Sequence, residues 1–570
     1  MAENGISGAE RAAAGAAGKT TFFWVLVSCL TVLAGAAFSF RFDQPFKTPK
    51  ILVLTLLVVL LGLRANGCRP LTPRMALLGL WPLLSGLWAV NPGAYIQSLG
   101  LFYLPFFAYM IAPGIDADGR LALRRGLLWA ALAVALYDLA LRTGVMAPSF
   151  QAGTVAGSFF GNPNFSAHFL FFALCFGRPR AKPWSYLWTG IIAAAILWSG
   201  CRAVWLATTF WFVLMVVTPK RALRGGLLLA AVLAVLGGVW LAFSADLRTG
   251  AFYMSHPRAY AAAFEKQPPL IADRDPWFAG KRLSLMTRII LQGNSAAMLG
   301  QRPLTGFGLG QFHSYYPKFS RSWVDDPNMS REYRAVSPHN LLLETALTLG
   351  WPWLSLFLSG LAAFYRKTAS RRSYWVGFCL QLGMAMGSLN YLNPMILTFL
   401  ALLAPPEGSG RSKTRSGFIL FVVLGWLPMV VSGLWDYRVA RAKEARDAAA
   451  VSPLFPEIRA NLFYADGRFE AAWREQVRAF ERDPYGPETL FNLALIAWEL
   501  GKSDGPRPRW LAVLALRTNR RMFPFYRPAV YYLQYFEERL PESERIWVHQ
   551  PMDDPYAILV AEIRGSGAAP

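Results

Sequence analysis

The sequence predicts an all-α protein in which about thirteen transmembrane helices are followed by a soluble domain of helical hairpins. Three observations predict this class. Of the 570 residues, 54% are hydrophobic and only 16% are charged. Apolar stretches of near-bilayer length recur through the first 435 positions, which a soluble protein of this size does not need. The C-terminal 135 residues lack such stretches and are typical of paired helices.

The membrane region begins after a short polar tail. Residues 1–20 carry charges of both signs ahead of the first apolar run, which indicates a cytoplasmic tail before an uncleaved helix rather than a cleaved signal peptide. Residues 21–435 then form the predicted multi-spanning domain. Its apolar runs start near residues 21, 50, 75, 96, 126, 165, 186, 203, 225, 339, 374, 392 and 417.

Charge in the connectors predicts the topology. Alternate connectors are rich in Lys and Arg and are therefore cytoplasmic, whereas those at 91–95 and 390–394 lack both residues and face outward. The long external segment 244–338 holds twelve Lys and Arg against seven Asp and Glu, but long translocated segments do not follow the charge rule. An odd number of spans also places the C-terminus outside.

Composition excludes other classes. The net charge of +23 does not indicate a nucleic-acid partner, because many of the basic residues lie in short loops between apolar runs rather than on one soluble face. The five cysteines contain no CxxC pair, so they predict neither a disulfide framework nor a zinc site.

The predicted outer side gathers four polar stretches. Two of them carry arginines, Arg202 in SGCRAVW and Arg288 in LSLMTRIILQ. Two guanidinium groups on one membrane face are able to grip a phosphate through paired hydrogen bonds. The alternatives are that Arg202 only anchors its helix at the headgroup level and that Arg288 is an ordinary solvated or ion-paired residue.

His339, in SPHNLLLETALTLGWP, is the best candidate for a general base. Imidazole titrates near pH 6.5, so close to neutrality it can take a proton from a hydroxyl. The alternative is a polar residue that merely caps the following helix. Asn340 and Glu344 share a face of that helix. The glycines of GFGLG, at 306–310, indicate a tight turn rather than a nucleotide-binding loop, because no α/β unit surrounds them.

Together, the stretches GSFFGNPNFSAHFL (157–170), SGCRAVWLA (199–207), the run from Arg288 through RPLTGFGLGQFHSYYP, and SPHNLLLETALTLGW resemble the O-antigen ligase and polymerase superfamily of bacterial envelope glycosyltransferases. With the surrounding spans, the resemblance covers residues 20–435 and implies a GT-C-like fold. In one respect the chain departs from the family, where Ser-Arg often stands in place of Cys201-Arg202.

The resemblance implies a glycan donor linked through diphosphate to a polyprenyl lipid. Arg202 and Arg288 match the arginines that hold the diphosphate, and His339 matches the histidine that activates the acceptor hydroxyl. We also expect Asn164 and Arg302 to line the substrate cavity. The anomeric carbon is then attacked with inversion and lipid diphosphate leaves, with no metal, nucleotide or other cofactor.

Residues 436–570 predict a second, helical domain. Gly467 and Gly501 lie 34 residues apart, which is the tetratricopeptide (TPR) period. The alternative is an irregular helical cap, because one repeat and a partial second are fewer than such stacks need. The topology puts this domain in the periplasm, where it is able to hold an acceptor, a glycan or a protein partner.

We therefore predict a multi-pass enzyme of the bacterial inner membrane whose active site faces the periplasm among membrane lipids. It transfers a glycan to lipid A core, a second glycan chain or a protein. The alternative function is that of an O-antigen or polysaccharide polymerase or a protein O-oligosaccharyltransferase, which the resemblance implies to share this machinery. More distant alternatives are a transporter of lipid-linked sugars, which would place its arginines at the membrane midplane, and a non-enzymatic envelope scaffold.

Overall fold

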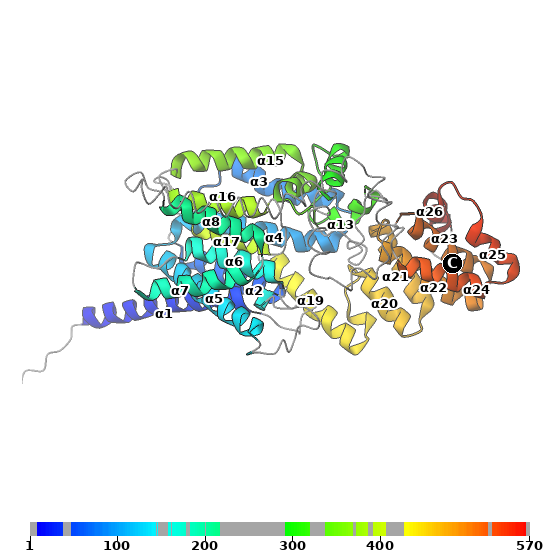
Figure 1. Cartoon of the computed structure of the whole chain (residues 1–570), viewed down its shortest axis with the longest axis horizontal. Coiled ribbons are helices and arrows are strands. Elements are labelled where there is room, and N and C mark those ends of the chain that lie inside the picture. The colour runs from blue at the N-terminus through cyan, green and yellow to red at the C-terminus, as the bar shows by residue number, and fades with distance from the viewer. Residues whose placement is uncertain are drawn as a thin grey trace, which may run out of the picture.

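The structure is a computed structural model in which every regular element is a helix, as predicted. Figure 1 shows a bundle of long helices that carries a second group of helices at one end. The structure describes residues 8–37, 47–65, 67–143, 145, 158–160, 162–177, 183–199, 201–216, 291–319, 337–368, 372–385, 392–405, 427–522 and 527–565.

The bundle contains helices from both halves of the predicted membrane region. The first helix begins before the predicted start at residue 21, since it includes part of the polar tail. The helices are α1 (Gly8–Ala36), α2 (Thr48–Arg64), α3 (Pro73–Leu84), α4 (Pro92–Ile111), α5 (Ala117–Arg142), α6 (Pro163–Phe176), α7 (Pro183–Trp198), α8 (Arg202–Val216), α13 (Phe312–Tyr315), α15 (Leu341–Thr368), α16 (Arg372–Ala385), α17 (Leu392–Leu402) and α19 (Leu427–Ala445).

Two helices in the described part of the chain are long and apolar enough to cross a membrane. They span Pro92–Gly114 and Leu341–Thr368. Three further apolar helices, Thr21–Ala36, Asn164–Phe176 and Leu187–Trp198, are shorter. The spans predicted to start at residues 225 and 417 lie mostly outside the described residues. The count of about thirteen spans therefore stays a prediction.

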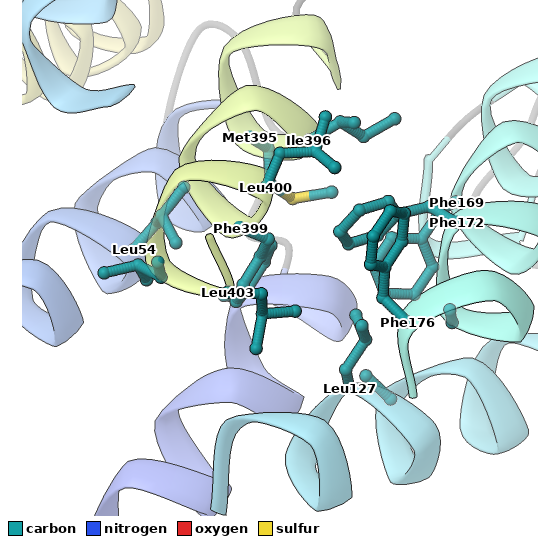
Figure 2. Packing of buried hydrophobic residues seen from close by; sticks show 14 of the residues in the cluster. Leu54, Leu127, Phe169, Phe172, Phe176, Met395, Ile396, Phe399, Leu400 and Leu403 are labelled. Atoms are coloured by element: carbon teal, nitrogen blue, oxygen red, sulfur yellow. The ribbon is translucent and has the colours of Figure 1, made fainter. Parts of the chain in front are cut away.

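The bundle is held together by one large apolar core. In Figure 2, phenylalanines of α6 face Met395, Ile396 and Phe399 of α17. The ring centroids of Phe172 and Phe399 lie 6.2 Å apart. Because α17 also packs against α4, the core joins helices that are some 300 residues apart in sequence. Burial of such side chains contributes about 1.5–3 kcal/mol each in a water reference, but in lipid the close fit contributes more than removal from solvent does.

Basic connectors meet at one end of the bundle. The Arg69 Nε donates to the Tyr109 carbonyl at 3.1 Å, and the guanidinium of Arg69 lies over the Tyr109 and Phe364 rings. Arg120 donates to the carbonyls of Ile115, Ala112 and Ala404. These contacts gather the termini of α4, α15 and α17 at the end that the charge pattern predicts to be cytoplasmic.

The C-terminal helices have an apolar core of their own. Antiparallel neighbours pack as hairpins, with α20 on α21 and α22 on α23. The helices are α20 (Pro456–Ala465), α21 (Phe469–Arg482), α22 (Pro487–Asp504), α23 (Pro506–Met522), α24 (Arg527–Arg539), α25 (Glu542–His549) and α26 (Pro555–Gly565). The predicted hairpins are therefore present, whereas membership of the TPR family stays a prediction.

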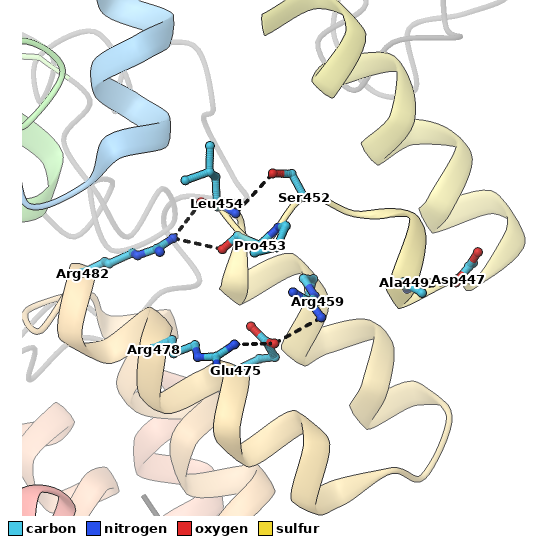
Figure 3. Close-up of polar contacts among 9 residues, drawn as sticks. All are labelled: Asp447, Ala449, Ser452, Pro453, Leu454, Arg459, Glu475, Arg478 and Arg482. Carbon is cyan, nitrogen blue, oxygen red and sulfur yellow. Dashed lines mark hydrogen bonds and ion pairs between the residues drawn. The ribbon is translucent and has the colours of Figure 1, made fainter. Parts of the chain in front are cut away.

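Segment 452–455 connects the two groups of helices (Figure 3). Arg482 of α21 donates to the carbonyls of Pro453 and Leu454 at 3.2 and 3.1 Å. A Cβ atom on Gly93, in the first turn of α4, would lie 3.3 Å from that Leu454 oxygen and 3.3 Å from the Phe455 ring. The Phe455 ring also meets Trp435 of α19 edge to face at 5.5 Å. The hairpins thus sit at the end of the bundle opposite the basic connectors.

Candidate functional site

His339 stands two residues before α15, in an unusual backbone conformation. Its φ angle is +51°, in the left-handed region that costs a non-glycine residue about 1–2 kcal/mol. The residues on both sides fix this conformation. The His339 amide donates to Ser337 Oγ at 3.3 Å, and Asn340 Oδ1 accepts from the Leu343 amide at 3.0 Å and so caps the helix. His339 is half-buried, above the first turn of α15.

Glu344 lies on the same helix one turn beyond Asn340, as predicted, since its amide donates to the Asn340 carbonyl at 2.8 Å. Its Oε2 is buried and has no hydrogen-bond partner among the described residues. A buried carboxyl oxygen of this kind is costly in an apolar setting, so it is a candidate contact for a polar ligand group.

The helix that follows His339 is broken at Gly350, where φ is 84° and ψ is 164°. Residues 303–308 fill the break. The amides of Phe307 and Gly308 donate to the carbonyls of Leu347 and Thr348 at 2.7 and 2.9 Å, and the Trp351 amide donates to the Pro303 carbonyl at 2.8 Å. These three bonds, which we call the α15 lock, satisfy backbone groups that a helix break would otherwise leave unpaired in an apolar region.

Glycine is needed on both sides of the α15 lock. A Cβ atom on Gly350 would lie 2.1 Å from the Leu304 carbonyl oxygen, and one on Gly306, whose φ is +66°, would lie 2.5 Å from the Thr348 backbone. The tight turn predicted for GFGLG is therefore confirmed. The turn lets the backbone of the loop pack directly against the backbone of the helix that follows His339.

The same loop reaches α4 through Gln311. The fully buried Gln311 side chain accepts from the Asn91 amide at 2.8 Å and donates to the Asn91 carbonyl at 3.0 Å. Asn91 in turn caps α4, since its Oδ1 accepts from the Ala94 amide at 3.1 Å. The predicted external connector at 91–95 thus lies beside the loop that locks α15.

Arg302 precedes this loop, at the end of the helix over residues 291–301. It is exposed, and its guanidinium carbon lies 5.2 Å from the Phe307 ring centroid and 5.7 Å from that of Tyr315. Burial raises the pKa of the Tyr315 hydroxyl, and the neighbouring Arg302 opposes that rise. Arg302 therefore presents a positive charge at the surface next to the α15 lock.

Asn164 lies in the first turn of α6, exposed, with its amide donating to Asn162 Oδ1 at 2.8 Å. Residues 159–160, shortly before Asn164, contact Lys50, a residue that was not selected from the sequence. The Lys50 Nζ donates to the carbonyls of Ala37 and Phe159 at 2.6 Å each and lies 4.9 Å from the Phe160 ring centroid. Only 1% of Lys50 is exposed. A lysine at the very start of a predicted apolar run is the signal that could have pointed to it.

Arg202 is the first residue of α8, and the cysteine before it is buried. The Cys201 amide donates to Ser199 Oγ at 3.1 Å, and the Ser199 hydroxyl donates to the Ile196 carbonyl at 2.6 Å. This turn fixes the start of α8 just after α7. Arg288 lies outside the described residues.

Hydrogen bonds thus connect α15, the helix that follows His339, with the glycine loop after Arg302, and that loop with the start of α4. Lys50 connects the stretch before Asn164 with the ends of α1 and α2. The residues that the structure describes contain no group of three or more His, Cys, Asp or Glu arranged to hold a metal ion.

The family model described as O-antigen ligase matches residues 187–358 of the chain. Over this stretch the chain is similar to the O-antigen ligase family. The match runs from α7 to Leu358 in α15, so it contains Arg202, Arg288, Arg302 and His339. The O-antigen ligase match and the two long apolar helices support a membrane protein with a glycan-transferring function in the cell envelope. No curated protein matched the chain.

Proposed function

We propose that the chain transfers a glycan from a polyprenyl-diphosphate carrier to an acceptor hydroxyl at the periplasmic face of the bacterial inner membrane. The observation that carries the proposal is His339. It stands in a strained backbone conformation at the mouth of α15, inside the O-antigen ligase match. Strain at a polar residue, held by well-formed contacts on both sides, is typical of functional sites.

In the proposed reaction, the His339 imidazole takes the proton from the acceptor hydroxyl. The hydroxyl oxygen then bonds to the anomeric carbon from the face opposite the leaving group, the bond from that carbon to the phosphate oxygen breaks, and the configuration inverts. Polyprenyl diphosphate leaves with the bonding electrons, and Arg202 and Arg288 stabilise its charge. The reaction needs no cofactor, and Asn164 and Arg302 are proposed contacts of the substrate cavity.

The acceptor is proposed to be lipid A core, a second glycan or a protein. The domain boundaries are proposed as a cytoplasmic tail at 1–20, a membrane domain at 21–435 with the periplasmic segment 244–338, and a periplasmic TPR-like domain at 436–570. Helix α19 runs through the boundary at 435 without a break, so the two domains share a continuous helix.

The test is glycan transfer in proteoliposomes. Polyprenyl-diphosphate glycan is supplied with lipid A core, a soluble glycan or a peptide, and wild type is compared with His339→Ala, Arg202→Ala and Arg288→Ala. We expect all three variants to lose transfer, with donor binding kept only by the histidine variant. Thermal unfolding of each variant shows that it is folded.

Two results would overturn the proposal. Undiminished transfer by His339→Ala would remove the histidine as base. Movement of the labelled donor between leaflets without any covalent product, in wild type and variants alike, would indicate a transporter. Among successful outcomes, the acceptor that receives the glycan separates ligase, polymerase and protein glycosylation.

A further inference from the structure

One face of the C-terminal hairpins combines aromatic rings with amide and carboxylate groups. The first helices of the three successive hairpins, α20, α22 and α24, supply its side chains. We call it the tyrosine face, and its members are Asn461, Tyr464, Asn492, Glu499, Tyr532 and Tyr535.

Direct contacts hold these helices in register. The Asn492 Nδ2 donates to Asn461 Oδ1 at 3.1 Å, which joins α22 to α20. The Phe491 ring meets Tyr532 edge to face at 5.1 Å, which joins α22 to α24. Burial raises the pKa of the Tyr464 hydroxyl, and the nearby Glu499, Tyr532 and Tyr535 raise it further. All three helices therefore meet around Tyr464.

The tyrosine face lies at the edge of the domain core, and its three tyrosines pack against that core. Behind it, the Trp498 and Phe536 rings stack in parallel at 3.9 Å and are buried. The members of the face are half-buried or, in the case of Asn461, exposed. Each tyrosine thus packs part of its side chain against the core and leaves the rest at the surface.

The chemistry of the face favours a neutral, polyhydroxylated ligand. Tyrosine rings offer flat apolar platforms for the C–H faces of sugar rings, and amides and carboxylates pair with adjacent hydroxyls as both donors and acceptors. Two exposed cations near the face already have partners within it. Lys502 pairs with Glu499 at 2.7 Å, and the Arg539 guanidinium carbon lies 3.6 Å from the Tyr535 ring centroid, so it covers one side of that ring and leaves the other for a ligand. An anionic diphosphate or a peptide carboxylate would need cations that face the ligand.

The domain also lies next to the candidate site. Lys318, which follows α13 and the glycine loop, has its Nζ 6.0 Å from the ring centroid of Tyr485, between α21 and α22. Figure 1 shows α13 between the bundle and these hairpins. A long chain held by the hairpins is therefore able to extend toward the end of the bundle where His339 lies.

We propose that the tyrosine face binds a segment of a glycan chain, several sugars away from the reacting end. This deepens the proposed function, since it makes the glycan of that reaction the ligand. The face then holds a growing or transferred polysaccharide close to the membrane domain, so that long chains are used more efficiently than short ones.

The first experiment measures binding. Full-length protein in detergent is titrated calorimetrically with two probes: polysaccharide released by mild acid from the envelope of the source cells, and a reduced, unfolded polypeptide. The variants are Tyr535→Ala and Asn492→Ala on the tyrosine face. The control is Arg474→Ala, an exposed residue on α21. We expect polysaccharide affinity to fall about tenfold in each face variant, since one stacked ring or paired amide contributes about 1–1.5 kcal/mol, and to stay unchanged in the control.

Binding of the polypeptide alone, or polysaccharide binding that neither face variant weakens, would overturn the proposal. Glycan transfer by the wild type separates this proposal from the proposed function. If the face variants bind polysaccharide more weakly and wild type transfers no glycan, the proposed function fails while the glycan site stands. If wild type transfers glycan and the face variants bind polysaccharide normally, only the glycan site fails.

Discussion

Substituting Gly350 by alanine is expected to disrupt the helix that follows His339. The φ of 84° and ψ of 164° at Gly350 lie in a region that is almost exclusive to glycine, and a Cβ atom there would lie 2.1 Å from the Leu304 carbonyl oxygen. The backbone penalty is about 1–3 kcal/mol. Relief of the clash requires the loop at 303–308 to move, which also weakens the three bonds of the α15 lock at about 0.5–1.5 kcal/mol each.

Together these terms predict a loss of about 2.5–7.5 kcal/mol for Gly350→Ala. The assay is thermal unfolding in detergent alongside glycan transfer in proteoliposomes, and both are expected to fall. Gly360→Ala is the matched control on the same helix, because its new Cβ would meet only Arg74 Cδ at 3.7 Å. Alanine is also the better helix former there, by about 0.5–1 kcal/mol. If Gly350→Ala unfolded and transferred glycan as Gly360→Ala does, the role given to the α15 lock would be refuted.

Three further predictions concern single contacts. Lys50→Met removes the donor to the Ala37 and Phe159 carbonyls and should lower both glycan transfer and thermal stability. Lys50→Arg keeps a donor and should recover part of each. Equal loss in both variants would contradict the role of Lys50 in holding these two segments together. Gln311→Leu removes both hydrogen bonds to the Asn91 backbone and should lower the free energy of unfolding in detergent by about 1–3 kcal/mol. An unchanged free energy of unfolding would mean that other contacts hold the loop against α4. Arg509→Met should destabilise the C-terminal helices by about 1–3 kcal/mol, because it leaves the largely buried Glu544 without its ion-pair partner at 2.6 Å. The double variant Arg509→Met/Glu544→Gln should recover part of that stability. Thermal unfolding followed by circular dichroism of the helices measures both.

The helical class followed from composition and apolar runs, and the structure confirms it. Arg69 and Arg120 come from two connectors that the charge pattern predicts to be cytoplasmic, and both lie at one end of the bundle. The side of the membrane that this end faces stays a prediction. The number of spans could not be fixed in this way. Several apolar helices are shorter than a bilayer crossing, and α5 carries charges at both ends and the buried Asp138 within it, so hydropathy alone does not decide its role.

For the site, the sequence pointed to His339 and to the tight turn at GFGLG, but not to what joins them. The loop at 303–308 joins the helix after His339 at the break at Gly350, where the backbones of the two segments lie in direct contact. The signal was present, because the LGWP stretch places a glycine and Pro352 inside an apparently continuous apolar helix. Pairing that break with a loop some forty residues earlier requires the tertiary structure. The same holds for Lys50, whose partners are two backbone carbonyls that no sequence pattern marks.

The central claim is that His339 is the base for glycan transfer, and the most direct measurement is the transfer rate of His339→Asn in proteoliposomes. Asparagine tolerates the left-handed conformation well, so this variant keeps the backbone that leads into α15 while it removes the imidazole. We predict normal thermal unfolding and a rate lowered by about 10²–10⁴-fold, as expected for the loss of a general base. A folded variant that transfers glycan within about twofold of the wild-type rate would contradict it.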